Sequence, residues 1–117
     1  MGTFNNYKEG NVFNTQFNVT EAVTSSQSNN TLVAAPGAGL SIYVTDVIFG
    51  TLNTATLSLQ DEDDNAVIAT LYAATAGSFQ VSLRTPVKLT ANKALEWDSA
   101  VSGSVAHNVT VCGYIAP

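Results

Sequence analysis

Apolar and polar residues alternate along most of this chain, and that period of two restricts the fold more than any other feature of the sequence. Residues 38–65 show it twice: apolar side chains share one parity at Leu40, Ile42 and Val44, and again at Ala55, Leu57 and Leu59. Successive side chains of a strand point to opposite faces, so the pattern predicts two half-buried strands. We expect these two strands, separated at Gly50, to be neighbours in a meander around which the rest of the chain packs.

The same alternation predicts further strands over residues 12–23, 31–35, 66–75, 79–84, 95–98 and 105–115. We expect residues 66–75 to form a hairpin with the Leu57 strand, the last run to be central, and Pro86 to lie at an edge or corner. Residues 24–30 are polar turn formers and predict a loop. About eight short antiparallel strands without an amphipathic helix predict a single-domain all-β protein, a β-sandwich or jelly roll over residues 12–117, with a barrel as the second choice.

One of these strands has an irregularity, because Asp46 falls on the same parity as Ile42 and Val44. A β-bulge near Thr45 or Asp46 would resolve it, since one extra residue moves the buried set to the parity of Val47. The alternative is that both faces of the strand are covered, one by the core and one by another subunit.

Residues 66–75 also carry apolar side chains on both parities, with Ile68 and Tyr72 on one and Val67 and Leu71 on the other. One sheet face alone cannot bury both sets. We therefore expect a homotrimer whose interface includes Tyr43, Val47, Ile68 and Tyr72.

Charge is scarce in this chain and restricts its partners. Charged residues form 11% of the 117 residues, against about 25% in ordinary soluble domains. The net charge is −5 and only four residues are Lys or Arg, too few to neutralise a phosphate backbone, so we exclude nucleic acid as a partner. No window approaches the length of a membrane span, so we expect no membrane partner. Cys112 is the single cysteine, and no disulfide is expected within the chain.

The residues that could carry catalysis are few. His107 is the only histidine, and it lies on a strand parity shared with valines, so we expect a hydrogen-bonded core or interface histidine. Trp97 is the first aromatic residue to test for stacking on a sugar, although burial is the stronger expectation. We predict that the chain is not an enzyme and has no catalytic or cofactor-binding residue.

Four consecutive acids, Asp61 to Asp64, follow the Leu57 strand. They begin like a calcium loop, but Ala66 replaces the required glycine and Tyr72 stands where the bidentate glutamate belongs, which excludes an EF-hand. We assign no metal ligand, and we expect the acids to form a hairpin tip that points at solvent, with a weaker calcium site as the alternative.

The segments LVAAPGAGLSIYVTDVIFG, ATLSLQDEDDNAVIATLYAATAGSFQVSL and NVTVCGYIAP resemble a recurring pattern of tailed-phage virion proteins. The chain is similar, over residues 32–117, to the capsid decoration proteins of these phages. The resemblance implies a trimeric jelly-roll cement protein without enzymatic activity, which is assembled in the host cytoplasm, binds the outer surface of an icosahedral head and bridges major capsid protein subunits. The alternative is a tail or fibre domain that recognises a receptor or a glycan.

Residues 1–11 have too few apolar residues in register to form an element, and we expect a flexible N-terminal arm. Phe4, Tyr7 and Lys8 are its anchors. Because an arm can become ordered on a partner and bury two aromatic rings, whereas the acidic hairpin would lose hydration without matched cations, we expect the arm to contact the capsid.

Overall fold

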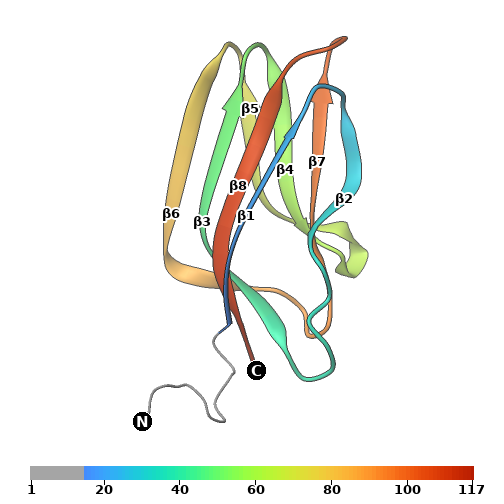
Figure 1. The fold of residues 1–117 in the computed structure, drawn as a ribbon, viewed down its shortest axis with the longest axis vertical. Coiled ribbons are helices and arrows are strands. Elements are labelled where there is room, and N and C mark those ends of the chain that lie inside the picture. Colours follow the sequence, from blue (N-terminus) through green and yellow to red (C-terminus); the bar gives the residue numbers. More distant parts are fainter. Residues whose placement is uncertain (1–14) are drawn as a thin grey trace.

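The alternating runs fold into eight strands arranged as two packed antiparallel sheets (Figure 1). The computed structural model describes residues 15–117; the expected arm, with Phe4, Tyr7 and Lys8, lies outside the described residues. The strands are β1 (Thr15–Val23), β2 (Gln27–Val33), β3 (Ser41–Thr51), β4 (Ala55–Asp61), β5 (Ala66–Ala73), β6 (Gly77–Lys88), β7 (Leu95–Val101) and β8 (His107–Ala116). A short 3₁₀ helix, η1 (Asp63–Asn65), joins β4 to β5. No helix in residues 15–117 is long and apolar enough to cross a membrane.

The connectivity identifies the sandwich as a jelly roll. One sheet has the strand order β1-β8-β3-β6, and the other has the order β2-β7-β4-β5. The chain passes from one sheet to the other at every connection except the one between β4 and β5. The predicted all-β class and the jelly-roll architecture are therefore confirmed, and the strands form two sheets instead of one closed barrel.

The expected meander of β3 and β4 is wrong, because the two strands belong to different sheets. Both edges of β3 are already paired, with β6 and with β8, so β4 has no free edge beside it. β4 instead lies between β5 and β7, and its hairpin with β5 confirms the predicted partner of the Leu57 strand. A periodic pattern shows that a segment is a strand, but it does not reveal which strand lies beside it.

The predicted bulge is present at Thr45. In both ladders of β3 the register shifts between Val44 and Asp46. The buried set changes there from Ile42 and Val44 to Val47 and Phe49, all at most 4% exposed. Val47 is therefore a core residue of the single chain, where its side chain is buried between the sheets.

The bulge also explains a glycine on the neighbouring strand. Gly113 pairs with Val44 at the bulge, and a Cβ atom there would collide with the Tyr43 carbonyl and with the ring of Phe17. Only glycine fits this close approach of two backbones.

The predicted loop at residues 24–30 is wrong in its second half, because β2 begins at Gln27. Polar side chains replace parts of the regular ladder: Ser99 Oγ accepts the Gln27 N–H at 3.0 Å, and Asp98 Oδ1 accepts the Asn29 N–H at 2.6 Å. The pairing of β2 with β7 is interrupted by two register shifts. The first half of this edge strand has no apolar alternation that sequence analysis could detect, whereas its second half overlaps the predicted strand over residues 31–35.

Two other predictions about strand position are confirmed. β6 runs through Pro86 at the edge of its sheet, as the missing N–H of proline requires. β8 lies between β1 and β3, and its residues His107, Val109 and Val111 face the core.

Trp97 lies at the centre of the space between the sheets and is fully buried. Its indole N–H donates to Glu21 Oε1 at 2.7 Å, which links β7 of one sheet to β1 of the other. Leucine, isoleucine, valine and phenylalanine side chains from both sheets complete the core: Ile42, Val44, Val47, Phe49, Leu57, Leu59, Leu89, Leu95, Val109 and Val111.

We predict that Trp97→Ala lowers the free energy of unfolding by about 3–5 kcal/mol, since it leaves a large cavity and an unpaired Glu21 carboxylate. Urea denaturation followed by tyrosine fluorescence measures the change. Leu52→Ala, at a side chain that is 72% exposed, is the control, with an expected effect within about 0.5 kcal/mol. Equal effects of the two substitutions would contradict this description of the core.

Candidate functional site

His107 is a hydrogen-bonded core residue, as the sequence predicts. Its ring is 4% exposed; Nδ1 lies 2.6 Å from the Val105 carbonyl oxygen, and Nε2 lies 2.7 Å from Ser99 Oγ. A carbonyl oxygen only accepts, so Nδ1 carries a proton, and in the neutral ring Nε2 accepts the Ser99 hydroxyl. The pair joins β8 to β7 and forms a second polar link between the sheets.

This Ser99–His107 pair has the distances of a nucleophile and its base, but not the access that catalysis requires. Ser99 is 6% exposed and faces the core. Its Oγ also accepts the Gln27 N–H, so the hydroxyl has a partner on each side. The pair therefore acts as a structural link.

The acidic turn is not the solvated tip that the sequence predicts. Asp61 is 7% exposed and accepts two backbone N–H groups, from Asp63 at 2.9 Å and from Thr90 at 2.9 Å. Glu62 Oε1 accepts the Ala94 N–H at 2.8 Å. The first two acids therefore hold the loop between β6 and β7 against the sandwich, and only Asp64 has no hydrogen-bonded side chain among the four.

A second polar cluster lies beside this turn, on the sheet of β4 and β7. Gln60 is 3% exposed, and its Nε2 lies 2.8 Å from Asn29 Oδ1, 3.2 Å from Glu96 Oε1 and 3.3 Å from Asn65 Oδ1. One buried amide thus joins three elements across the outer face of the sheet. Within residues 15–117 no group of three or more His, Cys, Asp or Glu side chains is arranged to hold a metal ion.

The remaining residues of the predicted trimer interface lie on different sheets. Tyr43 is on β3, where its ring stacks on Tyr114 at 4.8 Å and lies 5.8 Å from Lys88 Nζ. Ile68 and Tyr72 are on β5, Ile68 packed against the core and Tyr72 79% exposed. The structure does not bring Tyr43 together with the two β5 residues.

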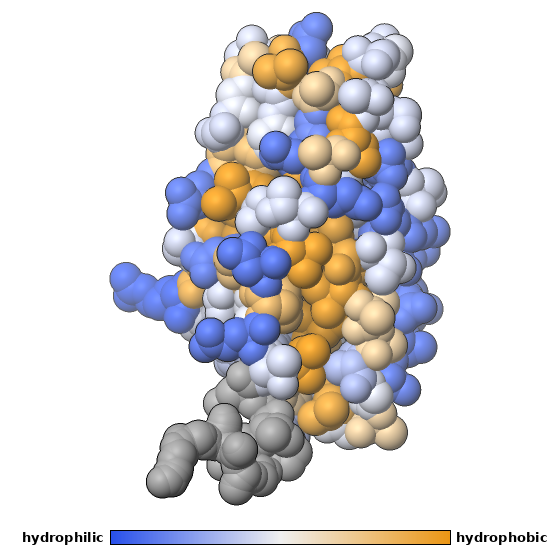
Figure 2. All heavy atoms as spheres, viewed as in Figure 1, coloured by the Kyte–Doolittle hydropathy of each residue, from blue (hydrophilic) through white to orange (hydrophobic). Residues whose placement is uncertain are grey.

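Both open sides of the sandwich are apolar, a feature that sequence analysis missed. On the side of β5 and β6, a narrow cleft of about 110 Å³ opens between the sheets and is lined by Ile68, Leu71, Phe79, Val81, Leu83 and Val87, among others. On the side of β1 and β2, the partly buried residues Phe17, Val23, Leu32 and Val33 pack against the core. Figure 2 shows an apolar band along the face in view, between the edge strands of the two sheets.

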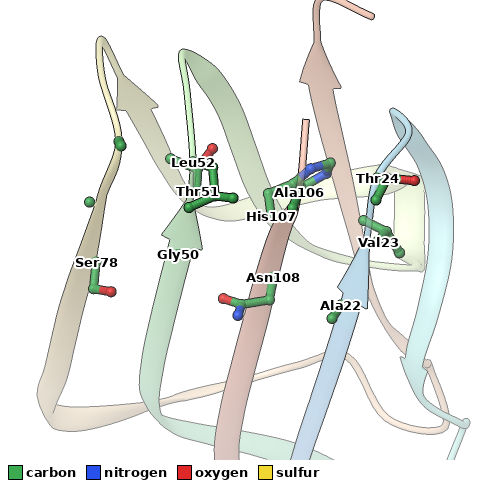
Figure 3. A pocket seen from close by; sticks show the side chains of 12 residues that line it. Ala22, Val23, Thr24, Gly50, Thr51, Leu52, Ser78, Ala106, His107 and Asn108 are labelled. Carbon is green, nitrogen blue, oxygen red and sulfur yellow. The ribbon is translucent and has the colours of Figure 1, made fainter. Parts of the chain in front are cut away.

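A hollow larger than this cleft lies elsewhere, at the end of the sheet formed by β1, β8, β3 and β6 (Figure 3). This pocket has a volume of about 570 Å³. Four residues paired across the four strands contribute to its wall: Ala22, Asn108, Gly50 and Ser78. We call it the end pocket. Its sequence signal is a set of small residues on different strands, and these are seen to lie in one row only when the pairing register of the strands is known.

We predict that Asp61→Asn costs about 1–3 kcal/mol of unfolding free energy, because an amide nitrogen then faces a buried N–H group that had a carboxylate oxygen. Asp64→Asn is the matched control: it removes one charge from the same turn, and asparagine tolerates the positive φ of 55° at this position. Thermal and urea denaturation of both variants test this, and a turn that merely points at solvent would give equal effects.

Comparison with known proteins gives fold-level similarity only. No protein-family model matches this chain, and no curated protein is significantly similar to it in sequence. A solved structure of the tobacco streak virus coat protein dimer is 12% identical, covers 87% of this chain and 88% of its own, and has a TM-score of 0.38. A second structure of that coat protein is 15% identical, with 95% and 91% covered and a TM-score of 0.33. At these values the similarity carries no information about what this chain binds or does.

Proposed function

We propose that this chain is a structural subunit of a virion, a decoration protein on the outside of a tailed-phage head, and that it has no catalytic role. The observation that carries the proposal is the pair of apolar open sides on opposite edges of one weakly charged sandwich. The jelly roll is compatible with it, because this fold recurs in viral capsid proteins, although it recurs in lectins and cupins as well. The resemblance of residues 32–117 to phage decoration proteins supplies the specific assignment.

The β5–β6 side is the first of the two contact surfaces. Along it Val67 is 62% exposed, Tyr72 79% and Val81 49%. Val81 lines the cleft, whereas Val67 and Tyr72 do not line it and pair with Gln60 and Thr56 along the edge strand β5. Exposed large apolar side chains on edge strands favour burial against a partner, and tyrosine is one of the residue types that carry most of the energy of an interface. Arg84 and Lys88 on β6 form no ion pair within the described residues, so the rim of this surface is polar and available.

The β1–β2 side is the second contact surface, and it lies at the other edge of both sheets. Two different surfaces on opposite edges fit a head-to-tail arrangement of identical subunits. Such an arrangement forms a closed ring when the rotation from one subunit to the next adds up to a full turn. We propose a ring of three, in which the β5–β6 side of one copy covers the β1–β2 side of the next. Tyr72 and Ile68 stay in this interface from the sequence prediction, whereas Val47 does not.

Attachment to the capsid is assigned to the N-terminal arm. The carboxylates of Asp61 and Glu62 already accept hydrogen bonds from backbone N–H groups of their own chain. These two acids of the turn are therefore poor candidates for contacts with a partner. Phe4, Tyr7 and Lys8 remain the proposed anchors on the major capsid protein. The alternative, a tail or fibre domain, differs in the location of the protein on the virion.

We predict that the protein is a trimer in solution and that Tyr72→Ser raises the dissociation constant of the trimer by about tenfold or more. Multi-angle light scattering over a concentration series measures this. Leu52→Ser removes a similarly exposed apolar side chain from outside both contact surfaces and is expected to leave the trimer intact. A wild-type protein that stays monomeric at micromolar concentration would overturn the ring.

We also predict that deletion of residues 1–11 abolishes co-sedimentation with empty capsids. The double variant Asp63→Asn and Asp64→Asn, which spares the two acids that hold the loop, is expected to bind normally. Antibody labelling of intact virions then shows whether the protein lies on the head or on the tail. Binding that survives the arm deletion and fails in the acid variant would reverse the assignment, and label confined to the tail would favour the fibre alternative.

A further inference from the structure

We propose that the end pocket binds a single neutral sugar unit, the terminal residue of a glycan. This proposal rests on the geometry of the pocket alone and does not depend on the virion assignment. A sugar offers hydroxyl groups together with a C–H face, and the pocket presents the complement of both.

The hollow exists because small residues from neighbouring strands lie side by side. Ala22, Gly50 and Ser78 fall in one row across β1, β3 and β6, with Asn108 of β8 between Ala22 and Gly50. Figure 3 shows the Asn108 amide beside Gly50. A Cβ atom at Gly50 would lie 2.6 Å from Asn108 Oδ1, so the Asn108 amide lies against Gly50, and a larger residue at this position would push the amide into the pocket.

Among residues 15–117, three polar side chains of the pocket have no hydrogen-bond partner, whereas Thr51 and His107 are already bonded within the chain. The side chains of Thr24, Ser78 and Asn108 form no hydrogen bond with any residue of 15–117, and all three are exposed. The next row of the same sheet face behaves differently, because the Thr20 and Thr110 hydroxyls bond to each other at 2.8 Å. The end pocket therefore gathers free amide and hydroxyl groups of the kind that recognise sugar hydroxyls.

The electrostatics of the pocket define the class of ligand. No Asp, Glu, Lys or Arg lines it, and His107, which does, is engaged with Ser99 and Val105 on the core side. A charged ligand would lose hydration here without gaining a counter-charge. Leu52, 72% exposed, provides an apolar wall for the C–H face of a sugar ring.

The affinity is expected to be low. Trp97, the first aromatic residue to test for stacking on a sugar, is fully buried, and no Phe, Tyr or Trp of residues 15–117 lines the pocket. A ligand of monosaccharide size without an aromatic platform binds with a dissociation constant of about millimolar.

The test is a titration of the ¹⁵N-labelled protein, followed by two-dimensional NMR, with glucose, galactose, mannose and N-acetylglucosamine in turn. We expect at least one of them to shift the amide signals around Ala22, Gly50, Ser78 and Asn108 in a saturable way. N-acetylneuraminic acid is the charged comparator and is expected to shift them less. Saturable shifts located elsewhere, stronger binding of the charged sugar, or no shift with any of the four neutral sugars would each overturn the proposal.

Variants separate the pocket from nonspecific effects. Asn108→Ala removes the amide and is expected to weaken binding at least fivefold, and Gly50→Ala fills the hollow and is expected to abolish it. Gln80→Ala, at an exposed position on β6 outside the pocket, is the control and should bind like the wild type. If Gly50→Ala does not give a folded spectrum, Ser78→Ala replaces it, and unchanged binding in the remaining pocket variants contradicts the proposal.

Discussion

The contact between the two sheets at Trp97 is the interaction on which the rest of this structure depends. A fully buried indole brings the largest apolar surface of any side chain into the core, but its N–H group needs an acceptor where no water is present. Glu21 supplies one from the opposite sheet, at 2.7 Å. The second link, from His107 to Ser99, again joins β8 to β7. Both links end on β7, so the position of that strand fixes the relative placement of the two sheets and, through Ser99 and Asp98, the irregular edge strand β2.

The sequence predicts those parts of the fold that are set by local chemistry. Alternation marks β1, β3, β4, β5 and β8, proline places β6 at an edge, and the misfit of Asp46 reveals the bulge at Thr45. Pairing could not be predicted in the same way, because β3 and β4 have identical periodicity whether they share a sheet or face each other across the core. The first half of β2, residues 27–30, escapes detection for a different reason: its backbone is satisfied partly by the side chains of Ser99 and Asp98, and its apolar residues, Leu32 and Val33, come only in the second half.

The candidate sites were harder to predict than the fold, because each is assembled from residues that are remote in sequence. The end pocket needs the register of four strands before Ala22, Gly50 and Ser78 are seen to lie in one row. Asp61 and Glu62 look like part of a solvated tip until the loop before β7 is placed against them. Burial of Trp97 and His107 was predictable, since both share the parity of apolar neighbours. The apolar cleft between β5 and β6 was not, because residues on two strands contribute to it from different sheets.

The two edges of the sandwich also restrict how a partner can be bound. An exposed edge strand can recruit another strand through its free backbone groups, and proteins prevent this with prolines, bulges and short or irregular strands. β2 carries two register shifts and a left-handed Asn29. In β6 the residues 83–86, Pro86 among them, stand between the two stretches that pair with β3. These two of the four edge strands are therefore poor templates for strand addition, whereas β1 pairs with β8 over its whole length without a register shift. A partner at β2 or β6 would therefore gain its binding energy mainly from side-chain packing and not from added backbone pairing, because the backbone of both strands is irregular.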